Sequence, residues 1–188
     1  MVESQHQEGN DDLIAILSAS DSSGSRKALE VIRDNINRLR GPASGEGAQT
    51  DGGERLELRF SHGSRLGDAG GFVFGTEKTC DIVLPEIEGI SKKHCALTFE
   101  KTDPRSREYR LVFRNLSDCE PAYVTYNNLG KITGKGANWT LNSQGSPNPF
   151  VRIELVILDD LRFVIAAEER EMDSSSYIAR IEHFLQAT

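Results

Sequence analysis

The sequence predicts an all-β protein: a two-sheet antiparallel β-sandwich flanked by an N-terminal and a C-terminal helix. About eight to ten short apolar runs lie between residues 55 and 167. Turn-forming residues separate these runs roughly every 8–15 positions, as in sandwich proteins. No helical pattern alternates with the runs, which disfavours a parallel α/β sheet.

The composition limits the class of protein. The chain has 188 residues, 37% of them hydrophobic, and a formal net charge of −7. This acidic balance disfavours non-specific nucleic-acid binding, which needs a basic surface. Cys80, Cys95 and Cys119 are not spaced for a disulfide framework or a zinc site, so we expect an intracellular location, nuclear or cytoplasmic. No apolar run approaches the ~20 residues that span a bilayer, so we expect no membrane partner.

The first 54 residues predict an extension outside the sandwich. The apolar run 13–17 is a strand or a helical turn, because periodicity cannot decide at this length. Residues 25–40 predict a helix, since apolar residues recur at three- and four-residue spacing. Residues 41–54 are Gly-rich and polar, which indicates a flexible linker. The folded core is therefore expected to begin at residue 55.

The sandwich is expected over residues 55–170. Its clearest hairpin joins 153–158 to 161–165 through Asp159-Asp160. The Gly-rich connection 61–71 fits neither common phosphate-loop pattern and is interpreted as a hairpin loop. The other predicted strands are 56–60, 72–74, 82–84, 95–99, 109–113 and 122–126, with a short apolar piece at 139–141.

Residues 171–188 predict a C-terminal helix. One helical face carries five apolar residues, and serines at the start of the segment can cap it. We expect this helix either to pack on the sandwich or to connect to a further part of the chain. The apolar residues are Tyr177, Ile178, Ile181, Phe184 and Leu185.

Residues 72–99 contain the side chains best suited to bind a ligand. A loop before the 95–99 strand carries Ser91, Lys92, Lys93 and His94. A hydroxyl that donates a hydrogen bond beside two ammonium groups suits an anion such as a phosphate. The same residues also fit a solvated, charged turn, and the local pattern alone favours that interpretation.

The order of these residues resembles the forkhead-associated (FHA) domain over roughly residues 55–167. The matching elements are Gly75, Asp81-Ile82, Ser91-Lys92-Lys93-His94 and the loop Asn115-Leu116-Ser117. The resemblance implies a β-sandwich that binds phosphothreonine peptides through loops at one end. It also implies that Ser91 and Lys92 contact the phosphate and that Gly75 and His94 have structural roles. A phosphothreonine-containing protein or peptide is the partner we expect, with the chain itself a monomer.

Two positions depart from the family's pattern. Thr76 replaces an arginine that grips the phosphate, and Thr supplies neither its charge nor its fork of donors. Glu120 replaces an asparagine that grips the peptide, and its like charge would lower the affinity for a phosphate. Lys78 is a further candidate for the missing charge. The sequence therefore predicts a phosphothreonine-peptide module with weakened phosphate recognition, or a docking scaffold that does not recognise phosphate.

The wider layout resembles the N-terminal region of fungal FHA-containing serine/threonine kinases. The sequence has no Gly-rich ATP loop, no catalytic His-Arg-Asp and no Asp-Phe-Gly. No metal motif, nucleotide loop or Ser/His/Asp spacing supports catalysis. We therefore expect an interaction module rather than an enzyme, with no cofactor or metal. This module is either a regulatory fragment of such a kinase or a stand-alone relative.

Overall fold

The structure is a computed structural model, and it describes residues 12–20, 25–39, 54–62, 70–127, 129–130, 138–141, 152–167 and 174–186. Within these residues, two helices, α1 (Ser25–Leu39) and α2 (Ser175–Gln186), and one 3-10 turn, η1 (Phe60–His62), accompany the strands. The strands are β1 (Leu13–Ala19), β2 (Arg55–Arg59), β3 (Gly71–Gly75), β4 (Ile82–Val83), β5 (Cys95–Lys101), β6 (Tyr109–Asn115), β7 (Tyr123–Tyr126), β8 (Leu129–Gly130), β9 (Asn138–Thr140), β10 (Ile153–Leu158) and β11 (Leu161–Ala167).

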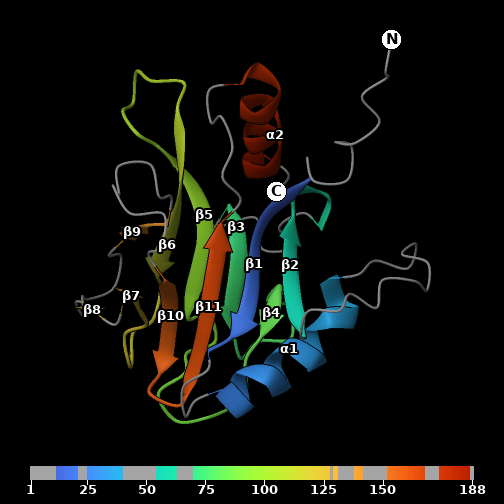
Figure 1. The fold of residues 1–188 in the computed structure, drawn as a ribbon, viewed down its shortest axis with the longest axis vertical. Helices are drawn as coiled ribbons and strands as arrows, with labels where there is room; N and C mark the ends of the chain where they lie inside the picture. The colour runs from blue at the N-terminus through green and yellow to red at the C-terminus, as the bar shows by residue number, and fades with distance from the viewer. Residues whose placement is uncertain are drawn as a thin grey trace.

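These strands form two sheets, which confirms the predicted β-sandwich with flanking helices (Figure 1). One sheet has the order β2-β1-β11-β10-β7-β8 and the other the order β4-β3-β5-β6-β9. The pairing is antiparallel except between β3 and β4, where Phe74 and Gly75 lie parallel to Ile82 and Val83. The five-stranded sheet is therefore mixed rather than purely antiparallel.

The core follows from the two-residue alternation of side chains along each strand. In β5, Leu97 and Phe99 belong to the main core between the sheets. Ala96 points to the opposite face, where it packs with Val73 and Cys80. Both faces of the five-stranded sheet are thus buried near its centre, which explains the continuous apolar runs in this part of the sequence.

β1 is a strand of the sandwich, so the sandwich includes residues upstream of residue 55, where the sequence pattern placed its beginning. β1 lies between β2 and β11, with Leu17 opposite Leu56 on one side and Ile165 on the other. The run 13–17 is apolar throughout and shows no period, because both faces of β1 are buried: the adjacent residues Ile14 and Ala15 point to opposite faces and both lie in the core, and α1 contacts this strand. The predicted linker 41–54 lies, except for its last residue, outside the described residues, and the rest of the domain division stays a prediction.

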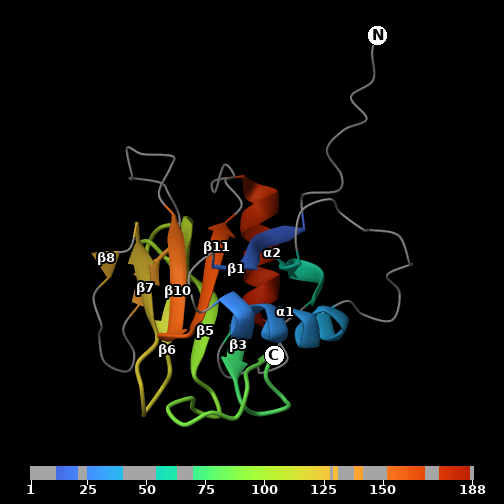
Figure 2. The ribbon, with the colours of Figure 1, turned by 60° about the horizontal axis from the view of Figure 1, so that its bottom comes forward.

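Helix α1 closes one side of the sandwich, and it is observed over Ser25–Leu39, within the range 25–40 that the sequence pattern predicts. It contacts β1, β2 and β11 of one sheet and β4 of the other (Figure 1), and Figure 2 shows the helix side-on. Its apolar stripe, which includes Val31 and Ile32, is buried in the main core. The helix therefore joins the two sheets at their β2 and β4 edges.

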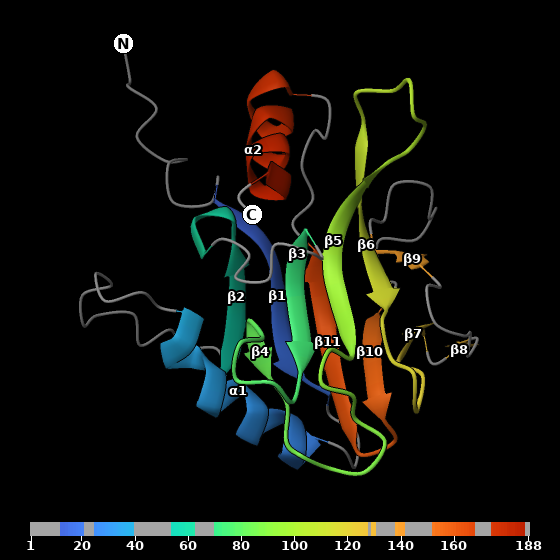
Figure 3. The same cartoon turned by 180° about the vertical axis from the view of Figure 1, so that it is seen from behind.

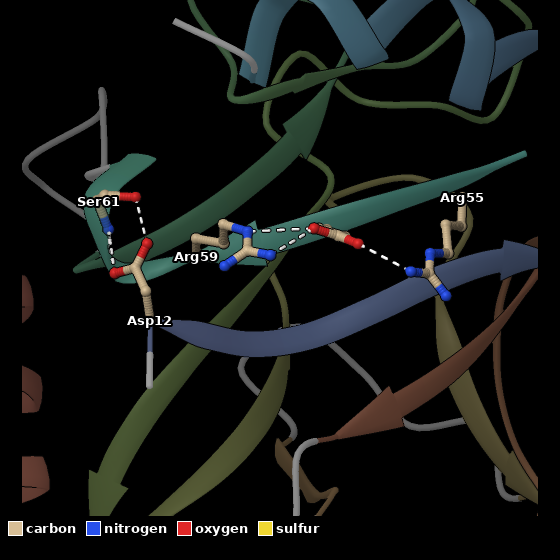
Figure 4. Close-up of polar contacts among 5 residues, drawn as sticks. Asp12, Arg55, Arg59 and Ser61 are labelled. Carbon is tan, nitrogen blue, oxygen red and sulfur yellow. Dashed lines mark hydrogen bonds and ion pairs between the residues drawn. The ribbon is translucent and has the colours of Figure 1, made fainter. Parts of the chain in front are cut away.

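The outer strand β2 carries a ladder of charges. Glu57 accepts hydrogen bonds from Arg59 at 2.7 Å and from Arg55 at 3.1 Å (Figure 4). Beside them, the carboxylate of Asp12 accepts a hydrogen bond from the Ser61 N–H. Burial raises the pKa of the Glu57 carboxyl, but the two arginines outweigh it and leave that pKa below its ordinary value. Charged side chains on a sheet edge disfavour pairing with another strand.

Helix α2 packs at the end of the sandwich opposite α1, so of the two expectations for this helix the packed one is observed (Figure 3). Ser174 accepts a hydrogen bond from the Tyr177 N–H at 3.3 Å and caps the start. Phe184 lies among aromatic rings, 5.3 Å from Phe72 and 5.8 Å from Phe60 between ring centroids. The helix thus covers the apolar end of the core.

Replacing Phe184 with Ala should destabilise the protein by about 3–5 kcal/mol, because it empties a buried aromatic site. Urea unfolding followed by circular dichroism would measure the change. His183→Ala, on the exposed side of the same helix, is the control and should shift the free energy of unfolding by less than about 0.5 kcal/mol. Equal effects of the two substitutions would contradict the packing of α2.

Candidate functional site

Three loops meet at the end of the sandwich opposite α2: β3–β4, β4–β5 and β6–β7 (Figures 1 and 3). Main-chain hydrogen bonds join the first two loops. The Thr76 N–H donates to the Ser91 carbonyl and the Glu77 N–H to the Lys92 carbonyl, each at 3.3 Å. The His94 N–H donates to the Phe74 carbonyl at 2.7 Å. The structure therefore brings Thr76 directly beside Ser91 and Lys92.

Gly75 makes this contact between the loops possible. A Cβ at this position would lie 1.9 Å from the Lys92 carbonyl oxygen and 3.0 Å from the Cys80 sulfur. A main-chain atom cannot move away as the end of a side chain can, so only glycine fits here. Asp81 supports the same region, since its buried carboxylate accepts the Val73 N–H at 2.9 Å.

The Ser91 hydroxyl is held by a second serine. Its Oγ lies 2.8 Å from the Oγ of Ser117, which is buried in the β6–β7 loop. Ser117 Oγ already accepts the Cys119 N–H at 3.1 Å. When Ser117 donates its own proton to Ser91, the proton of Ser91 is left for a ligand. The sequence pattern included Ser117 only as part of a loop and did not reveal this role.

His94 fixes the main chain of Ser91. The Ser91 N–H donates to His94 Nδ1 at 3.1 Å, so this nitrogen carries no proton. Burial lowers the pKa of His94 to about 4. The imidazole is therefore neutral at physiological pH, and its remaining proton is on Nε2, which has no hydrogen-bond partner among the described residues.

The lysines of the candidate site are exposed. Lys92 and Lys78 both present their side chains to solvent. The Lys78 carbonyl accepts a hydrogen bond from Arg38 of α1 at 2.6 Å, which fixes its main chain while the ammonium group stays outside. The main-chain hydrogen bonds between the two loops place Lys92 beside Thr76. Lys78 is related to Thr76 only by its place in the same β3–β4 loop.

Glu120 lies against the β4–β5 loop. A Cβ added to Gly89 would lie 2.8 Å from the Cγ of Glu120 and 3.4 Å from the side chain of Leu158. Gly89 has a φ of 93°, a conformation that favours glycine. The exposed carboxylate of Glu120 therefore belongs to the same loop cluster as Ser91, in a position where solvent screens its charge.

Part of the chain is similar to a known protein family. Residues 72–148 match the family model of the FHA domain. This range includes Gly75, Thr76, Ser91, His94 and the β6–β7 loop, so the resemblance drawn from the sequence is confirmed there. The stretch 72–148 is assigned to the FHA domain family, whose members are interaction modules.

Ten chains of known structure also match. One is the MEK1 FHA domain in a crystal structure with a HOP1 phosphothreonine peptide. It is 16% identical, the match covers 52% of this chain and 79% of that chain, and the TM-score is 0.31. No curated protein matched the chain.

Membrane spans and metal clusters are both absent from the described residues. None of the helices there has the length and apolar character needed to cross a membrane. Within the same residues, no group of three or more His, Cys, Asp or Glu side chains is placed to hold a metal ion. The predicted relation to fungal serine/threonine kinases stays a prediction.

The neutral state of His94 predicts a pH dependence of stability. Between pH 6.5 and about 4, the unfolded chain binds a proton at this residue that the folded protein excludes. Stability is therefore lost as the pH falls through this window, by about 3 kcal/mol at pH 4 from this residue. His94→Asn removes the titration and keeps an acceptor, so its stability should fall less over the same window.

The measurement is the free energy of unfolding of both proteins at several pH values between 7 and 4. His183→Gln is the control, because His183 is exposed. A parallel loss of stability in the wild type and His94→Asn would show that His94 does not titrate as described.

Proposed function

We propose that this protein is a phosphothreonine-peptide-binding module with weaker phosphate recognition than FHA domains that keep the arginine. FHA domains bind phosphothreonine peptides through loops at one end of the sandwich. The observation that carries the proposal is the Ser91 hydroxyl, held 2.8 Å from Ser117, at the end where the three loops meet. Lys92 beside it supplies a positive charge.

The binding step needs hydrogen bonds and charge. In the proposed complex the Ser91 hydroxyl donates to a phosphate oxygen, and the exposed ammonium group of Lys92 adds a charge-assisted bond. Lys78 contributes a second positive charge from the neighbouring loop. The neutral His94 and the buried Ser117 keep the Ser91 backbone and hydroxyl in place, which lowers the entropic cost of binding.

The reduced affinity follows from Thr76 and Glu120. Thr76 lies beside Ser91 through its main chain, but its side chain has one hydroxyl in place of a guanidinium fork. Glu120 adds a negative charge to the same loop cluster. Because Glu120 is exposed, its repulsion is partly screened by salt.

Thr76 and Glu120 also favour one alternative, a docking scaffold that does not recognise phosphate. The two functions differ in what they require of Ser91. A phosphopeptide module needs its hydroxyl, whereas a scaffold would keep its partner after Ser91→Ala. We further propose a non-enzymatic, monomeric protein that acts in the nucleus or cytoplasm, as a stand-alone module or as the regulatory part of a kinase.

Ser91→Ala should weaken binding of phosphothreonine peptides by about tenfold or more, because a hydrogen bond to a charged group is lost. The measurement is calorimetric titration of the chain with phosphothreonine peptides selected from a library, and with their unphosphorylated forms. Ser176→Ala, on α2 at the opposite end, is the matched control and should leave affinity unchanged. Equal binding of both peptide forms by the wild type would favour the scaffold.

Thr76→Arg should strengthen phosphopeptide binding by about three- to tenfold, because it adds the missing guanidinium beside Ser91. Thr79→Arg adds the same charge to an exposed position of the same loop and is the control for non-specific attraction. The gain should exceed that of the control and should persist in about 0.3 M salt, where exposed charges are largely screened. An equal gain in both variants would argue against a phosphate site at Thr76.

A further inference from the structure

Helix α1 is bonded to the edge strand next to the candidate site. The Asn35 side chain is fully buried and donates from Nδ2 to the Val83 carbonyl at 2.9 Å. Its Oδ1 accepts the Val83 N–H at 2.8 Å. One side-chain amide therefore satisfies both main-chain groups of a β4 residue, as a neighbouring strand would do.

Arg38 extends this connection to the β3–β4 loop. It lies one turn after Asn35 in α1, and its guanidinium donates to the Lys78 carbonyl at 2.6 Å and to the Cys80 carbonyl at 3.2 Å. Both bonds come from the same guanidinium nitrogen, Nη2, so one terminal NH2 group joins two carbonyls of the loop. The loop is thus fixed from the side that faces α1.

The other side of this loop forms the candidate site. The N–H groups of Thr76 and Glu77 bond the carbonyls of Ser91 and Lys92. A continuous series of contacts therefore runs from Arg38 through the β3–β4 loop to the Ser91 segment. A loop held at both sides has fewer conformations to lose when a ligand binds.

We propose that α1 is a positioning element of the phosphopeptide site and that Arg38 is its positioning residue. This inference rests on the proposed function. Arg38 acts through the loop, since it bonds the carbonyls of Lys78 and Cys80. Because α1 precedes the matched stretch 72–148, the binding unit is longer than the family match. Helix α1, which the sequence pattern placed outside the sandwich, thereby becomes part of the site.

The test uses the full chain with Arg38→Ala, Arg38→Lys and the control Arg33→Ala. Arg33 lies on the same helix, but it pairs with Glu54 at 2.5 Å, away from the loop. Amide hydrogen exchange at Thr76, Glu77 and Lys92 reports the order of the loops. Calorimetric titration with a phosphothreonine peptide and its unphosphorylated form reports binding.

In Arg38→Ala we expect faster exchange of these amides and about three- to tenfold weaker binding of the phosphopeptide. The melting temperature should change little, because Arg38 is partly exposed and lies outside the main core. Compared with Arg38→Ala, Arg38→Lys should keep part of the affinity, since an ammonium group can still donate to these carbonyls but on a more flexible side chain than the planar guanidinium. Arg33→Ala should change neither exchange nor affinity.

The outcomes separate this inference from the proposed function. If the wild type prefers the phosphopeptide while Arg38→Ala leaves either the amide exchange or the phosphopeptide affinity unchanged, the positioning role of α1 is overturned. That result would overturn only this role and would leave the proposed function in place. A wild-type chain that binds both peptide forms equally would overturn the proposed function, and the positioning role with it. Equal losses in Arg38→Ala and Arg33→Ala would show a general effect of charge and would overturn the positioning role of Arg38.

Discussion

The candidate site depends on the close approach of two main-chain segments, at Gly75 and at Lys92. A Cβ on residue 75 would lie only 1.9 Å from the Lys92 carbonyl oxygen, which leaves no room for any side chain there. This approach allows the Thr76 and Glu77 N–H groups to bond the Ser91 and Lys92 carbonyls. Ser91 is then in reach of Ser117 and His94, so the whole cluster follows from one glycine.

The sequence predicted much of the fold, because most strands show turn signals and alternating or short apolar runs. It did not place β1, since a run that is apolar throughout has no period and can be a strand or a helical turn. It also did not show the parallel pairing of β3 with β4, which covers only two residue pairs. Pairing over so short a range depends on long-range packing, which local patterns do not encode.

The site was predictable where a residue pattern carries the chemistry, as for Gly75, Ser91 and His94. Their positions in the structure are described, and their binding roles stay predictions. The roles of Asn35 and Arg38 were not predictable, because both bond main-chain groups 40 or more positions away in the sequence. Any residue can supply a carbonyl, so no side-chain pattern marks such a contact. Ser117 could have been found from the loop pattern that includes it.

Thr76 contributes to the loop arrangement through its main chain alone, and this has a consequence for how affinity can evolve. Substitutions of its side chain can alter ligand recognition while the loops keep their shape. Selection could then raise or lower affinity at this position at little cost in stability, which is uncommon for sites whose residues also hold the fold together. Related chains with different residues after the glycine would form a graded series of binders on one scaffold.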